Sequence, residues 1–111
     1  MDLSNNFRGE FTVTFKKKET PALFSMNALR ILLKNEKLKL EDFDSWVSSD
    51  PLTAIPLIAY YSVINSQTYA GKKFSANKDL FIAEMLDNGQ LEKITEAMTS
   101  AMKVEKGLGK S

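Results

Sequence analysis

The chain contains no histidine and no cysteine. Their absence excludes disulfides, the thiol nucleophile, the most common general base and the two most common zinc ligands. Magnesium can be held by carboxylates alone, but no acidic loop has a suitable spacing. These absences indicate a non-catalytic, protein-binding domain with no cofactor and no metal.

The chain also lacks an excess of charge of either sign, and it lacks a long apolar run. The 111 residues include 15 basic and 14 acidic side chains, for a net charge of +1, so no general field attracts a nucleic acid. No apolar run approaches the roughly 20 residues that span a bilayer. The polar start, Met1–Asn6, lacks the apolar region of a signal peptide. We therefore expect a cytoplasmic protein with no membrane contact, and the lack of cysteine permits a reducing compartment.

Near the start of the chain, alternation predicts a β-hairpin. Phe11–Phe15 alternates apolar and polar residues with the period of a half-buried strand. Lys16–Thr20 is expected to be an exposed turn. Pro21–Phe24 is expected to return as a short strand whose proline suits an edge. The residues before the hairpin, 1–9, are expected to be a flexible N-terminus.

The rest of the chain has the three- and four-residue spacing of helices. Expected helices cover 26–34 with Ser25 as N-cap, 41–49, 57–69, a segment from Ser75 or Asn77 to Asn88, and 90–106. We expect a mainly α fold: a small bundle of four or five helices with an N-terminal β-hairpin. It forms a single helical domain over 10–106, followed by a flexible C-terminal tail at 107–111.

The central helix is expected to be the most buried one, because Leu57–Tyr69 is apolar almost all round. Gly71 is its natural stop. Pro56 leaves two alternatives open. Either the helix begins near this proline, or a helix that starts with Asp50 as N-cap and Pro51 as first residue is kinked there.

Three polar motifs suggest chemistry and have simpler explanations. The end of the chain, Gly107–Ser111, resembles a phosphate-binding loop, but the position that requires glycine is Val104. The carboxylates of Glu41, Asp42 and Asp44 suit the positive start of a helix. The basic run Lys16–Lys18 is explained as a solvated turn, with a nucleic-acid contact as the alternative.

An aromatic and methionine-rich set offers two interpretations. Core packing is the default for such residues, and an adaptable surface for another apolar helix is the second interpretation. On the second interpretation we predict a partner-binding surface at these positions: Trp46, Tyr60, Tyr61, Met98 and Met102.

The order of these segments resembles a known family. The strand Phe11–Phe15 and a turn lead into Leu23–Arg30, which resembles the opening hairpin and helix of tail assembly chaperones from long-tailed bacteriophages. Asp50–Leu52 with Leu57–Ile64 looks like the central helix of that family. Lys78–Asp87 followed by Gln90–Lys103 is similar to its closing helix pair. The resemblance covers roughly residues 10–104.

The resemblance implies a function and partners. A member of this family binds the apolar, helical tape measure protein and keeps it soluble before the tail tube forms. It acts in the host cytoplasm and is absent from the mature virion. Many members also have a longer, frameshifted form, and Gly109-Lys110 is compatible with a slippery coding sequence. That longer form and the tail tube protein are further implied partners.

Two other functions remain as alternatives. The chain could be a structural homo-oligomer in which strand 11–15 pairs between subunits. It could also be a small nucleic-acid-binding regulator, which near-neutral charge disfavours. An enzyme is the last choice, because no second catalytic group accompanies the carboxylates.

Overall fold

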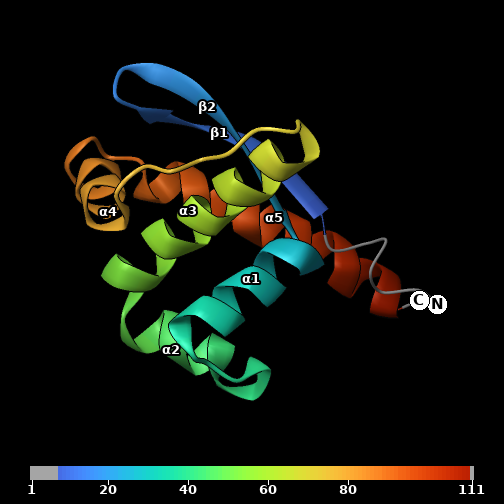
Figure 1. Ribbon diagram of the computed structural model, residues 1–111. Coiled ribbons are helices and arrows are strands. Elements are labelled where there is room, and N and C mark those ends of the chain that lie inside the picture. Colours follow the sequence, from blue (N-terminus) through green and yellow to red (C-terminus); the bar gives the residue numbers. More distant parts are fainter. Residues whose placement is uncertain (1–7, 111) are drawn as a thin grey trace.

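The computed structural model describes the backbone of residues 8–110 and the side chains of residues 9–100. In this part of the chain an N-terminal two-stranded antiparallel hairpin is followed by five α-helices, so the protein is mostly helical, as expected. Figure 1 shows the hairpin along one side of the helices, α3 through the middle and α2 at the end farthest from the hairpin.

The elements follow one another with short connections. They are β1 (Arg8–Phe15), β2 (Lys18–Ser25), α1 (Met26–Glu36), the short 3-10 helix η2 (Leu40–Asp42), α2 (Phe43–Ser49), α3 (Pro51–Tyr69), α4 (Lys78–Asp87) and α5 (Leu91–Lys110). β1 begins inside the segment expected to be flexible, whose first seven residues lie outside the described chain.

The hairpin is longer and its turn tighter than expected. Phe15 pairs with Lys18, so only Lys16 and Lys17 form the turn, and Lys18–Thr20 belongs to β2. Both turn residues have positive φ angles of 52° and 65°, the conformation of a type I′ turn, which matches the twist of the two strands. The sequence predicted a turn here but not its two-residue type, because lysine is an unusual residue at positive φ.

Helix α3 forms the centre of the core. Ala54–Ala59 is buried without interruption, and two apolar clusters pack on different sides of the helix. One cluster joins α3 to α1, α2 and Met98. The other joins it to the hairpin, α4 and the start of α5. Pro56 lies inside α3, so the alternative that the helix begins there is wrong, and Pro51 is its first residue.

A buried polar contact, rather than the expected cap, connects the hairpin to α1 and α3. Ser25 occupies the N-cap position of α1, but its side chain makes no capping bond. Its hydroxyl instead accepts a hydrogen bond from Asn65 Nδ2 at 2.9 Å. The same nitrogen donates to the carbonyl oxygen of Leu23 at 3.0 Å, and Asn65 Oδ1 accepts from Asn27 at 2.7 Å.

The sequence predicts both the N-cap of α4 and the glycine turn that precedes α5. Asn77 accepts a hydrogen bond from the Leu80 N–H and caps α4, whereas Ser75 lies outside the helix. Gly89, with φ of 68°, separates α4 from α5. The last helix extends to Lys110, beyond the expected end at Lys106 and into the segment expected to be a flexible tail. The side chains after Ser100 lie outside the described residues.

Candidate partner-binding surface

The structure places four of the five residues predicted to bind a partner in or against one apolar cluster of the core. Tyr61 and Met98 expose only 3% and 8% of their surface and belong to the core, so they cannot form an external surface in this conformation. Trp46 and Tyr60 are half-buried and pack against the same core. Met102 lies outside the residues whose side chains are described. The set does not form one exposed patch, because the three- and four-residue spacing serves internal packing.

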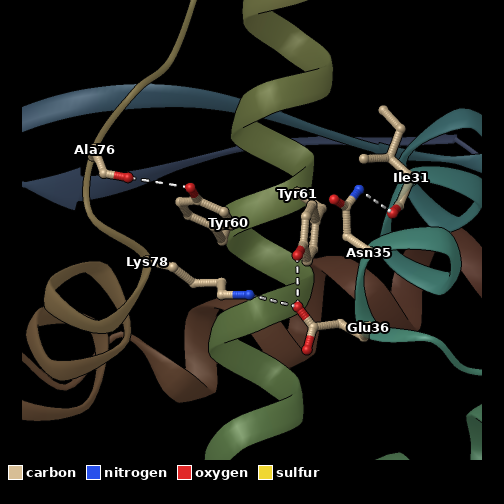
Figure 2. Close-up of polar contacts among 7 residues, drawn as sticks. All are labelled: Ile31, Asn35, Glu36, Tyr60, Tyr61, Ala76 and Lys78. Atoms are coloured by element: carbon tan, nitrogen blue, oxygen red, sulfur yellow. Dashed lines mark hydrogen bonds and ion pairs between the residues drawn. The ribbon is translucent and has the colours of Figure 1, made fainter.

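Hydrogen bonds explain why Tyr60 and Tyr61 of α3 lie inward. Figure 2 shows the Tyr61 hydroxyl donating to Glu36 Oε2 at the end of α1, at 2.6 Å, and the Tyr60 hydroxyl donating to the backbone oxygen of Ala76, at 3.1 Å. Lys78 Nζ, at the start of α4, lies 3.0 Å from the same Glu36 oxygen. A phenol can be buried at low cost when its hydroxyl has a partner, as both do here.

The Tyr61–Glu36–Lys78 contact has an electrostatic consequence. Burial raises the pKa of the Tyr61 phenol above its usual value near 10, and the hydrogen bond to Glu36 and the negative charge of that carboxylate raise it further. The Glu36 side chain is 20% exposed and that of Lys78 41%. These groups fasten α1 and α4 to α3, so we interpret them as a structural contact.

The exposed apolar surface lies elsewhere. The large hydrophobic residues that the described side chains leave most exposed are Leu40 at 61%, Leu52 at 60%, Tyr69 at 69%, Leu80 at 42% and Met26 at 40%. Leu40 precedes α2 and Leu52 follows it, with the half-buried Trp46 between them in the chain. Exposed leucines near an aromatic residue are a feature of protein-binding sites.

Four carboxylates accompany these leucines. Glu41, Asp42, Asp44 and Asp50 are all exposed, and none forms an ion pair with a described residue. Residues 40–71 contain these four acidic side chains and no lysine or arginine, a net charge of −4, whereas the rest of the chain carries +5. This separation is visible in the sequence, but the near-neutral total charge conceals it. We name Leu40, Leu52, Trp46 and the four carboxylates the α2 surface.

Two open depressions lie on the other side of the molecule, along the hairpin. One, of about 490 Å³, is lined by β1, β2 and the end of α3, including Phe11, Leu23 and Tyr69. The other, of about 580 Å³, lies beside the turn and α4 and includes Lys16, Lys17 and Glu84. Neither encloses a buried titratable group, so neither has the features of an active site.

The outer edge of β1 is partly occupied by side chains. Gln90 Oε1 accepts a hydrogen bond from the Thr14 N–H at 3.1 Å, and Glu84 Oε1 accepts one from the Lys16 N–H at 2.9 Å. On the other strand, Pro21 has no N–H to offer, and Asn65 already binds the oxygen of Leu23. A strand from another subunit would have to displace these contacts, which disfavours pairing through the hairpin.

The described region contains no candidate metal cluster and no candidate membrane-spanning helix. Within it, no three acidic side chains lie close enough to hold a metal ion, and no helix is both long and apolar enough to cross a bilayer. In comparisons with protein families, characterised proteins and solved structures, nothing matches this chain. Its function therefore has to be inferred from its residues and their geometry.

Proposed function

We propose that this chain is a non-catalytic, protein-binding domain that acts as a tail assembly chaperone of long-tailed bacteriophages. Its partner is the apolar, helical tape measure protein, which it keeps soluble before the tail tube forms. The observation that supports this proposal most is the α2 surface, where the leucines that precede and follow α2 in the chain stay about six-tenths exposed and Trp46 of α2 is half-buried.

This chain would keep its partner soluble by burying the apolar surface of that partner. A long amphipathic helix in water exposes a stripe of large apolar side chains and aggregates through it. Covering that stripe removes the exposed area of both proteins from water at once, and fully burying one leucine contributes about 1.5–3 kcal/mol. A chaperone has to release its partner later, so a few exposed leucines suit the task better than a large apolar interface.

The two alternative functions have less support. Pairing of β1 between subunits has to displace Gln90 and Glu84 from the strand edge. A nucleic-acid-binding regulator needs a continuous basic face. The exposed run at Lys16–Lys18 is short, and the four carboxylates of the α2 surface repel phosphate.

Co-expression tests the proposed function. We expect the tape measure protein encoded in the same genome to move from the insoluble to the soluble fraction when this chain is present, and the two proteins to elute together in gel filtration. A tape measure protein that stays insoluble with this chain, and forms no complex with it, would refute the proposal. A chain with Lys17→Ala, far from the α2 surface in the fold, serves as a control and should act like the natural chain.

A further inference from the structure

We propose that the α2 surface binds an amphipathic helix whose apolar stripe is flanked by lysine or arginine. This inference rests on the proposed function and states which segments of the partner are recognised. Leu40 and Leu52 supply the apolar contacts, and Glu41, Asp42, Asp44 and Asp50 supply the charge that selects a basic helix.

The exposed leucines lie on a firm framework. Phe43 of α2 is 4% exposed and lies in the core, and its ring centroid is 6.1 Å from that of Trp46. Helix α2 packs against α3, which begins directly after Asp50. Leu40 lies in η2, directly before α2, and Leu52 lies in the first turn of α3, so both belong to ordered elements that adjoin this core contact. Their exposure does not come from a loose loop.

No basic side chain of residues 9–100 forms an ion pair with these carboxylates. The early turns of a helix favour negative charge, which explains Glu41, Asp42 and Asp44 in part. Asp50 stands at the N-cap of α3 but makes no side-chain capping bond there. Since none of the four is ion-paired with a described residue, their charge is available to an approaching protein.

The basic residues that precede this surface do not cancel it. Lys37 and Lys39 lie between α1 and η2, both are exposed, and neither forms an ion pair with a carboxylate of the described side chains. Lys34, in the last turn of α1, is exposed as well. Lys37 is the C-cap residue of α1 and Lys39 the N-cap residue of η2, whereas residues 40–71 carry only negative charge. The chemistry of the surface thus combines apolar contact with attraction of cations.

A basic helix fits this chemistry better than other occupants. Anionic lipids and nucleic acids carry phosphate, which the carboxylates repel. A second copy of this chain is the rival occupant, because its exposed Leu80 lines the same depression as Lys16 and Lys17. Self-association in light scattering distinguishes that occupant from a basic helix. An amphipathic helix offers both kinds of contact in a single element.

A peptide titration tests this inference, with Trp46 as reporter because it is the only tryptophan. The probe is an amphipathic peptide of about 18 leucine and lysine residues, long enough to form a helix. We expect saturable binding to the full chain with a change in Trp46 emission, and weaker binding when the salt concentration rises from about 0.05 to 0.5 M. A peptide with glutamate in place of lysine should not bind.

Variants separate the apolar and the charged contributions. The double variant Leu40→Ser, Leu52→Ser should weaken binding of the leucine–lysine peptide about tenfold or more, and Asp44→Asn should weaken it less and reduce the salt dependence. Leu80→Ser is the matched control, because Leu80 is also exposed but lies on α4, and it should leave binding unchanged. All these positions are exposed, so the variants should fold.

Several results would overturn the inference. They are equal binding of the glutamate peptide, an unchanged Trp46 spectrum, equal weakening by Leu80→Ser, or self-association of the chain through this surface in light scattering. If Leu40→Ser, Leu52→Ser still keeps the tape measure protein soluble in co-expression, the α2 surface is excluded while the proposed function stands. If the natural chain fails in co-expression but binds the peptide, the proposed function fails.

Discussion

At the scale of single residues, buried polar groups connect segments that are distant in the chain. Asn65 is fully buried within α3 and bonds to Leu23, Ser25 and Asn27 at the junction of β2 and α1. Tyr61, one turn earlier in α3, bonds to the end of α1 through Glu36. A buried polar group that loses its partner costs more than the bond itself is worth, so these two positions should be sensitive to substitution.

Replacing Asn65 with leucine tests the junction. The substitution removes both hydrogen bonds donated by Nδ2 and leaves the buried oxygen of Leu23 without that partner. We expect the free energy of unfolding to fall by about 2–3 kcal/mol in urea denaturation. The control is Asn35→Leu, which removes an exposed bond to Ile31 and should cost less than about 1 kcal/mol. Equal losses for the two variants would contradict the role given to Asn65.

Replacing Tyr61 with phenylalanine tests the electrostatics of the α1–α3 contact. The pKa of Tyr61 is raised in the folded chain, so the phenol keeps its proton at a pH where the unfolded chain, with a pKa near 10, has lost it. This contribution to stability is fully present below pH 10 and is lost as the pH rises above that value.

The measurement is urea unfolding at pH 8 and at about pH 10.5. The natural chain should lose more stability between these two conditions than Tyr61→Phe. Lysine titration is common to both proteins and cancels in the comparison. An equal loss in the two proteins would show that the phenol is not protected in the folded state.

At the scale of elements, the hairpin is stabilised by the helices against which it packs. Val13 and Phe15 pack into the core with Phe81 and Ile94, while Gln90 binds the backbone of β1 and Glu84 binds the backbone of the turn. These contacts stabilise the two-stranded sheet, which by itself would be only marginally stable in water. The edge contacts should also limit pairing between chains.

Removing both edge contacts tests their role. The double variant Glu84→Ala, Gln90→Ala leaves the Thr14 and Lys16 N–H groups without these acceptors. We expect it to associate as its concentration rises, measured as mass by light scattering, because an open edge templates strand pairing. Asp87→Ala with Glu92→Ala, two exposed carboxylates nearby, is the control and should not associate. A variant that keeps the mass of the natural chain would refute a protective role for the edge contacts.

The elements also show what the sequence could and could not predict. Apolar spacing located the hairpin and five helices, because periodicity reports which face of a segment is buried. It left two alternatives for Pro56, because a proline fits the first turn of a helix as well as a kink within one. The structure places Pro56 inside α3. Apolar spacing could not distinguish Tyr61 and Met98 in the core from a binding stripe, because both have the same spacing.

At the scale of the whole molecule, charge is separated although the total is near zero. The α2 surface is acidic and carries exposed leucines, and the basic hairpin turn lies at the far end of the molecule (Figure 1). On the proposed function, such a distribution would orient the protein toward a basic partner before contact, and the leucines would then contact that partner. The proposed chaperone activity therefore depends on one end of the molecule.

Amide hydrogen exchange of the chain alone and in complex with the tape measure protein tests this account most directly. We predict that binding slows exchange in residues 38–54, around α2, and leaves the hairpin turn at Lys16–Lys18 unchanged. Protection confined to the hairpin, or a complex in which residues 38–54 exchange as fast as in the free chain, would contradict the account.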